Sequence, residues 1–164
     1  GPVYVRLVRD ATQHLFDDSH VFEPGKAVVV REGRDVTLIG TGAQTPRVVD
    51  AADLLATRGI DAHVVHLPTL KPLDVEGIVE AAGRTGFVIT AEEHSVIGGL
   101  GGAVAETLSE HLPRHLRRIG LQDVFGESGS NEDLLDRYGL SAARVAEQVE
   151  SLLRARREEV PARA

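Results

Sequence analysis

Hydrophobic and polar positions along the chain follow two alternating periods, which predict strands and helices in turn. Short apolar runs indicate buried strands. Each is followed by a segment whose apolar residues recur every three or four positions, as in an amphipathic helix. The strands predicted in this way are residues 36–39, 63–67, 87–90 and 116–121. Because strands that alternate with helices form parallel sheets with right-handed crossovers, we predict an α/β fold with a mainly parallel sheet.

Residues suited to cap helices stand before the predicted helices. They are Thr45, Asp74, Ser130 and Ser141. Each has a side-chain oxygen that can accept a hydrogen bond from a free amide of the first helical turn. We expect the first helix to end at Gly59, and a further helix to begin at Ala103 after a glycine-rich turn.

The two ends of the chain depart from this regular pattern. Residues 3–9 alternate as a half-buried strand does, and a polar, irregular stretch follows. A strand before a long linker is typical of the last strand of a preceding domain. We therefore divide the chain into residues 1–10, that strand; 11–34, a linker; 35–157, the main domain; and 158–164, a charged tail that we expect to fray.

The overall composition fits one globular domain. The 164 residues are 42% hydrophobic and 26% charged, a balance typical of folded domains. The net charge of -7 argues against a general binder of nucleic acids or anionic membranes, because both partners favour a basic face. Cysteine is absent, which excludes disulfides, thiolate metal sites and a cysteine nucleophile. No apolar run approaches the roughly 18 residues of a membrane-spanning helix, so we expect a soluble, cytoplasmic protein.

Polar chemistry is concentrated directly after the predicted strand at 87–90, at the edge where α/β sheets meet ligands and partners. Glu92, Glu93 and His94 stand there, before a glycine-rich turn. Two adjacent carboxylates would repel a phosphate, so we interpret the turn as close packing at an interface rather than as an anion-binding nest. The interface residues predicted here are Glu93, His94, Gly98, Gly99 and Gly101.

His94 has a second possible role, as a general base with a substrate within hydrogen-bond reach. A small hydrolase built around His94 and Ser128 would be one form of it. The serine nucleophile elbow needs a glycine two residues away on each side, and the spacing Gly126-x-Ser128-Gly129 does not provide that. We therefore predict a loop at Ser128 and a hydrogen-bonded interface histidine at His94.

The turn at residues 40–45 imitates a dinucleotide-binding fingerprint, since Asp61 follows about twenty residues later. Two departures weaken the match. Thr45 replaces the third glycine, and Asp61 precedes the second strand instead of following it. We interpret the segment as a tight turn between strand and helix, and keep a nucleotide-binding regulatory domain as the alternative function.

The histidines give no support for a metal site. His63 and His66 lie on opposite faces of one predicted strand, and Pro113 breaks the helical spacing between His111 and His115.

Four segments, in order, resemble transketolases. Residues 1–9 resemble the closing strand of a transketolase pyrimidine-binding domain. Residues 35–42, the Glu-Glu-His-Ser and glycine-turn segment at 92–101, and residues 125–129 resemble the transketolase C-terminal domain, in the form found in short or split transketolases. Deoxyxylulose phosphate synthase and the beta subunits of 2-oxo acid dehydrogenases share this domain and are close alternatives. The resemblance implies a three-layer α/β sandwich around a mainly parallel, roughly five-stranded sheet.

The resemblance also implies thiamine diphosphate and Mg²⁺ in the complete enzyme, with a two-carbon ketol unit moved between sugar phosphates in carbohydrate metabolism. In this family the cofactor lies between pyrophosphate and pyrimidine domains of a dimer. This chain lacks the Gly-Asp-Gly motif and the activating glutamate of those domains. We therefore expect no catalytic residue, no cofactor-binding residue and no metal ligand within it, and no activity of the chain alone. The expected partners are the missing domains or subunit and a second copy in a homodimer.

Arg9 is the residue in this chain that the resemblance connects with the substrate. It matches the family arginine that binds the substrate phosphate at the end of the closing strand. A guanidinium suits that role because it bonds phosphate oxygens in pairs. A solvated charge at a strand end is the alternative.

Overall fold

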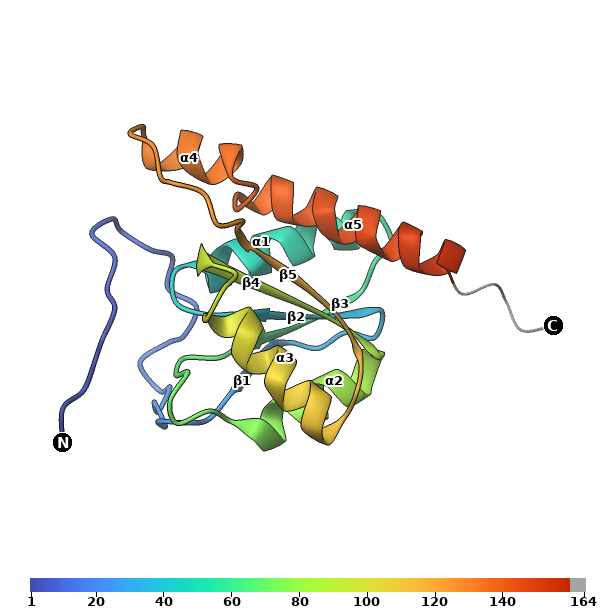
Figure 1. Cartoon of the computed structure of the whole chain (residues 1–164), viewed down its shortest axis with the longest axis horizontal. Helices are drawn as coiled ribbons and strands as arrows, with labels where there is room; N and C mark the ends of the chain where they lie inside the picture. Colours follow the sequence, from blue (N-terminus) through green and yellow to red (C-terminus); the bar gives the residue numbers. More distant parts are fainter. Residues whose placement is uncertain (160–164) are drawn as a thin grey trace.

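The structure is a computed structural model of the chain, and it describes residues 1–159. Five strands form one sheet in the order β1-β3-β2-β4-β5 (Figure 1). The strands are β1 (Val28–Arg31), β2 (Val36–Gly40), β3 (Ala62–His66), β4 (Phe87–Ser95) and β5 (His115–Leu121). The helices are α1 (Gln44–Thr57), α2 (Val75–Thr85), α3 (Leu100–His111), α4 (Asn131–Arg137) and α5 (Ala142–Glu159).

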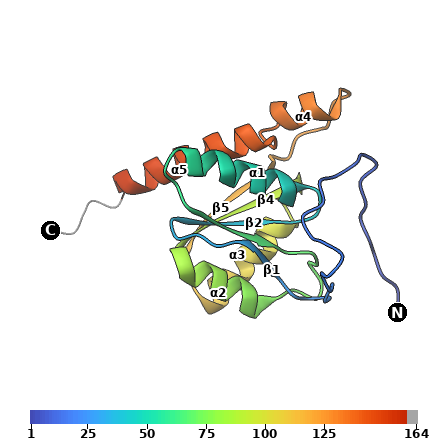
Figure 2. The same ribbon diagram turned by 180° about the vertical axis from the view of Figure 1, so that it is seen from behind.

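The sheet is mainly parallel, as the sequence predicts. β2 pairs in parallel with β3 and β4, and β4 with β5, while the edge strand β1 runs antiparallel to β3. Figures 1 and 2 show α1 and α5 covering one face of the sheet and α2 and α3 covering the other. The chain therefore forms the expected three-layer α/β sandwich, with the carboxyl ends of the parallel strands at one edge.

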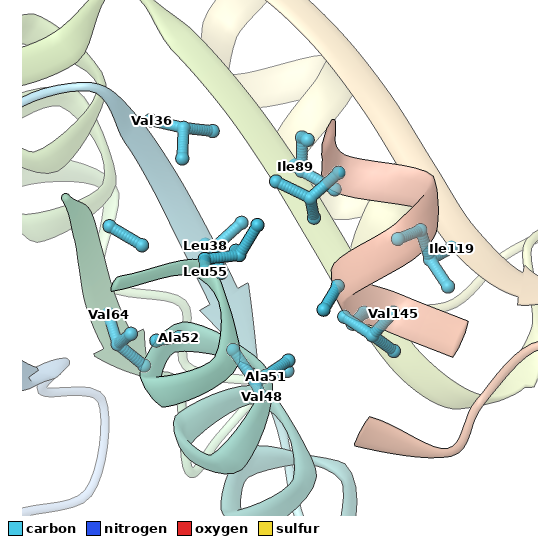
Figure 3. Close-up of a cluster of buried hydrophobic side chains, with 14 of the residues drawn as sticks. Val36, Leu38, Val48, Ala51, Ala52, Leu55, Val64, Ile89, Ile119 and Val145 are labelled. Carbon is cyan, nitrogen blue, oxygen red and sulfur yellow. The ribbon is translucent and has the colours of Figure 1, made fainter. Parts of the chain in front are cut away.

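Two apolar clusters hold the layers together. The cluster beneath α1 and α5 contains the buried side chains that β2, β3 and β4 direct toward these helices, and Figure 3 shows them converging there. Its members include Leu38, Val48, Leu55, Ile89 and Val145. The cluster beneath α2 and α3 contains Ile39, Val65, Ile78, Val88 and Leu108. Alternation along each strand thus supplies both faces, as expected for a sheet covered on both sides.

Capping chemistry starts α2 and α4 where the sequence predicts. Asp74 Oδ1 accepts the amide of Gly77 at 3.1 Å, and Ser130 Oγ accepts the amide of Asp133 at 3.2 Å. The expected cap at Thr45 is wrong, because α1 begins at Gln44, two residues earlier than that cap implies, and its N-cap Ala43 makes no side-chain hydrogen bond. Thr45 is buried inside the first turn and bonds a histidine instead.

Other boundaries also shift. β4 continues to Ser95 and α3 begins at Leu100, so the predicted turn is shorter than the sequence suggested. β1 lies within residues 11–34, which the sequence assigned to a linker. Its pairing with β3 comes from tertiary contact rather than from local alternation. α5 runs through Glu158, where the sequence placed the start of a frayed tail; residues 160–164 of that tail lie outside the described residues.

Residues 1–8 are extended in sequence pattern but pair with no strand in the described structure. Val3, Tyr4 and Leu7 are all exposed. A strand is stable only with hydrogen-bonding neighbours, so the assignment of residues 1–10 to a preceding domain stays a prediction. Among residues 1–159, no helix combines the length and apolar character needed to cross a bilayer.

Candidate functional site

β4 carries the three polar residues singled out in the sequence to the carboxyl edge of the sheet. Its pairing with β2 ends at Ala91, and Ser95 pairs with Leu121 of β5. The last residues of β4 therefore extend beyond the end of β2. Because successive side chains of a strand point to opposite faces, Glu92 and His94 are directed away from Glu93.

Glu92 is buried, with 1% of its surface exposed, and it binds the start of α3. Its Oε2 accepts the amide of Leu100 at 2.7 Å, and its Oε1 accepts the amide of Gly101 at 2.7 Å. A carboxylate is favoured there because the amides at a helix N-terminus are unsatisfied and carry partial positive charge. The position that an external anion would take is thus held by the chain's own side chain.

Three glycines near this carboxylate allow close packing around it. A Cβ at Gly99 would overlap Glu92 Oε2, and a Cβ at Gly101 would lie 2.7 Å from Cδ of Arg118. A Cβ at Gly120, on β5, would lie 3.2 Å from Cγ of Glu92. The close packing expected of Gly99 and Gly101 is therefore internal to the domain in this structure.

Glu93 joins the carboxyl edge to α1 through Arg47. Arg47 Nη1 lies 2.7 Å from Glu93 Oε2 and 3.0 Å from Gln44 Oε1. Both charged side chains are partly buried, which shields the pair from solvent more than a surface ion pair is shielded. Arg47 was not among the residues predicted from the sequence. Its place in the first turn of a helix that follows β2, next to β4, was the signal that would have located it.

His94 and Gly98 are the predicted interface residues that remain open to solvent. The His94 side chain is 50% exposed, and its Nδ1 lies 2.8 Å from the carbonyl oxygen of Ser95 and 3.9 Å from Glu92 Oε2. Gly98 has a φ of +72°, a conformation that favours glycine. Ile97 between them is 62% exposed. We call His94, Ile97 and Gly98 the edge patch.

The turn that imitated a nucleotide-binding fingerprint is filled by contacts within the chain. Thr41 Oγ1 donates to the carbonyl of Leu67 at 2.7 Å, and Gln44, which is buried, donates to the carbonyl of Leu140 at 2.8 Å. Asp61 lies at the opposite edge, where its amide bonds Asp35. The structure supports a tight turn between β2 and α1.

The remaining sequence candidates lie apart from the edge patch. Ser128 is exposed in the segment before α4, and within residues 1–159 it makes no hydrogen bond to His94. His63 is buried on β3, and burial lowers its pKa from the ordinary value. Arg9 is exposed. No three His, Asp or Glu side chains of the described residues are grouped as metal ligands.

Comparison with known families identifies a match over most of the chain. The family model described as "Transketolase, C-terminal domain" matches residues 25–145. A 6-deoxy-6-sulfo-D-fructose transketolase subunit from Clostridium sp. (strain MSTE9) is 45% identical over 145 residues, covering 88% of this chain and 45% of that protein. A 1-deoxy-D-xylulose-5-phosphate synthase from Desulforudis audaxviator (strain MP104C) is 44% identical over 160 residues, covering 95% of this chain and 25% of that protein.

A solved structure described as "Split gene transketolase, inactive beta4 tetramer" has the same fold. It superposes with a TM-score of 0.84 at 48% sequence identity, covering 88% of this chain and 48% of that one. The chain thus spans about half the length of the split subunits it matches.

Proposed function

The chain belongs to the transketolase C-terminal domain family, and we propose that it serves as the assembly domain of a split, thiamine-diphosphate-dependent transketolase. The complete enzyme would move a two-carbon ketol unit between sugar phosphates in the cytoplasm. This domain would hold subunits together and leave the chemistry to the other domains. The Mg²⁺ and thiamine diphosphate of that enzyme would be held by the other domains; among the residues that the structure describes, no three His, Asp or Glu side chains are grouped as metal ligands.

The observation that carries the proposal is the division of roles at the end of β4. The Glu92 carboxylate accepts the amides of Leu100 and Gly101. The turn therefore has a structural role, because these amides are not available to bind an external anion. Its outer surface, the edge patch, exposes an imidazole, an isoleucine and a glycine. An apolar side chain next to a side chain that can donate or accept is suited to a protein interface.

The proposed partners are a subunit carrying the pyrophosphate-binding domain and a second copy of this polypeptide. The relative described as an inactive beta4 tetramer supports self-association without activity. The coverage of about half of each split subunit supports a pyrimidine-binding domain upstream of this one. We propose a homodimer as the core of the assembly, with the edge patch and the Glu93–Arg47 pair near its interface.

Arg9 is proposed to bind the phosphate of the sugar substrate. It follows the exposed alternating segment, which the resemblance assigns to the closing strand of the pyrimidine-binding domain. In that position the guanidinium would lie outside the assembly domain, at the end of the strand that leads into it. Arg9→Ala in the complete enzyme should raise KM for the phosphorylated donor more than it lowers kcat, because uniform binding is lost.

The assembly role is tested by placing a bulky charge on the edge patch. His94→Arg should weaken self-association at least about tenfold by sedimentation velocity, because a buried interfacial charge is left without a partner. His111→Arg is a matched control. The side chain of His111 is 49% exposed, like that of His94, but it lies at the other end of α3. Equal association of the two variants would contradict the proposal.

The catalytic division of labour is tested separately. The chain alone, given a ketose phosphate donor, an aldose acceptor, thiamine diphosphate and Mg²⁺, should show no turnover. The complete assembly, with the upstream domain and the partner subunit present, should show turnover. Turnover by the chain alone would refute the assignment of this domain to assembly.

A further inference from the structure

The segment between the N-terminal residues and β1 contacts the domain at its two ends, near Phe16 and at Gly25 and Ala27. Gly25 donates its amide to Thr69 Oγ1 at 2.9 Å, and Ala27 donates its amide to Asp74 Oδ2 at 2.8 Å. A Cβ at Gly25 would lie 2.8 Å from Cγ of Pro72, so the two backbones are in close contact. We call residues 15–27 the strap. It lies against the loop that leaves the carboxyl end of β3.

The upstream end of the strap is held by three aromatic rings. Phe16 stacks on His20 with ring centroids 4.1 Å apart and planes 15° apart. Phe16 also meets His66, the last residue of β3, at 5.7 Å and 45°. Phe16 is half-buried, unlike Phe22 farther along the strap, which is 57% exposed. Phe16, His20 and His66 form what we call the latch.

A local turn presents the two strap rings on one side. Asp17 accepts the amide of Ser19 at 2.9 Å, and its carbonyl accepts the amide of His20 at 3.1 Å. This side-chain turn is typical of aspartate in tight loops. It brings His20 back over Phe16, so the two rings of the stack belong to one local turn.

The surroundings of His66 favour a neutral imidazole. Its Nδ1 lies 2.7 Å from Thr45 Oγ1 of α1. Its sheet neighbours, Val28 of β1 and Gly40 of β2, carry no charge, and the strap adds Phe16 and the titratable His20. Burial, and then the nearby His20, lower the pKa of His66 from its ordinary value.

We propose that the latch is a pH-sensitive fastening, which fixes the direction in which the N-terminal segment leaves the domain and releases the strap when His66 is protonated. A protonated His66 would have to lose water beneath Phe16 and lie close to the His20 ring, which also disfavours its charged form. Undocking removes both costs. The latch thus couples solution acidity to the orientation of whatever precedes Asp10, and its test does not depend on transketolase activity.

The direction of the pH effect follows from the two states. With the strap docked, the pKa of His66 is depressed, so the undocked state binds more protons in the window below the ordinary histidine pKa. Docking is fully favourable above that window and weakens as the pH falls through it.

The test is amide hydrogen exchange at Gly25 across the histidine titration range, in the whole chain. Exchange protection at Gly25 should fall on acidification in the wild type. In Phe16→Ala it should be at least about tenfold lower at neutral pH, because the apolar contact that holds the strap is lost. Phe22→Ala is the matched control, an exposed phenylalanine of the same strap, and should leave Gly25 protected.

The pH component is tested with His66 and His20. NMR titration should give His66 a pKa below the ordinary value in the wild type, with a rise in both Phe16→Ala and His20→Gln. His66→Gln should remove the pH dependence of protection at Gly25. Equal protection in Phe16→Ala and the wild type would overturn the latch, and pH dependence that persists in His66→Gln would overturn the role of protonation. His20→Gln changes an exposed side chain, so it tests the coupling without unfolding the domain.

Discussion

Two histidines at the carboxyl edge of the sheet, His66 and His94, differ in how far they are buried. His66, at the end of β3, is covered by the strap and bonded to Thr45. His94, near the end of β4, is half exposed and bonds a carbonyl of its own strand segment. On β4 the buried polar side chain is that of Glu92, which lies two residues before His94. The same edge thus has a covered end, suited to holding the chain's own linker, and an open end, suited to another molecule.

Among the substitutions at the open end, removal of the Glu92 carboxylate should lower the free energy of unfolding most. Glu92→Ala leaves the amides of Leu100 and Gly101 unsatisfied in a buried place, so the free energy of unfolding should fall by about 3 kcal/mol. Urea denaturation measures this. Glu93→Ala breaks a partly exposed pair with Arg47 and should cost about 1 kcal/mol or less. Equal losses would mean that the helix start does not depend on Glu92.

A methyl group at Gly99 should give the next largest effect. Gly99→Ala forces a Cβ against the bonded Glu92 carboxylate, so we expect a loss of about 2 kcal/mol in thermal or urea unfolding. Gly102→Ala is the control within the same turn of α3. A Cβ at Gly102 would have no neighbouring atom within 4 Å, and alanine there should be neutral or stabilising by up to about 1 kcal/mol.

The covered end should be more sensitive to acid. Burial lowers the pKa of both His66 and His63 in the folded chain, so the unfolded chain binds more protons below the ordinary histidine range. The stability that the neutral imidazoles contribute is complete above that range and falls as the pH drops through it. His66→Gln should reduce this fall, and His63 should account for the remainder. Urea midpoints at about pH 5.5 and 7.5 bracket the effect; an unchanged fall in the variant would contradict it.

The smallest effect on stability should come from His94. His94→Ala removes an exposed ring with one local hydrogen bond, so the free energy of unfolding should stay within about 0.5 kcal/mol of the wild type. A larger loss would show that the open end is part of the core. A small loss together with weaker self-association would separate interface from fold.

Features set by neighbouring residues could be predicted from the sequence. The caps at Asp74 and Ser130 bond amides three residues away, and apolar runs located the four parallel strands. The prediction of a cap at Thr45 failed because a capping position can be recognised from the sequence, whereas the bond that Thr45 makes, to His66 of a distant strand, depends on the tertiary fold. Local pattern was reliable where the bond itself is local.

Features that depend on distant segments could not be predicted. β1 is recognisable only through its pairing with β3, and Phe16 meets His66 across some fifty residues of chain. Glu92 was identified as a charge that would repel anions, but its bonds to Leu100 and Gly101 depend on how the turn folds back. The alternation at residues 3–9 was visible, but the described structure offers it no partner strand.

The outer strands of the sheet have a consequence for how copies of the chain meet. β1 is only four residues long and its register slips between Val29 and Arg31, while β5 exposes Arg117 and Arg118. Short, irregular or cationic margins make poor templates for a foreign strand. Neither edge strand therefore favours the addition of a strand from another copy, which would lead to fibres. Association between copies should instead use side-chain surfaces.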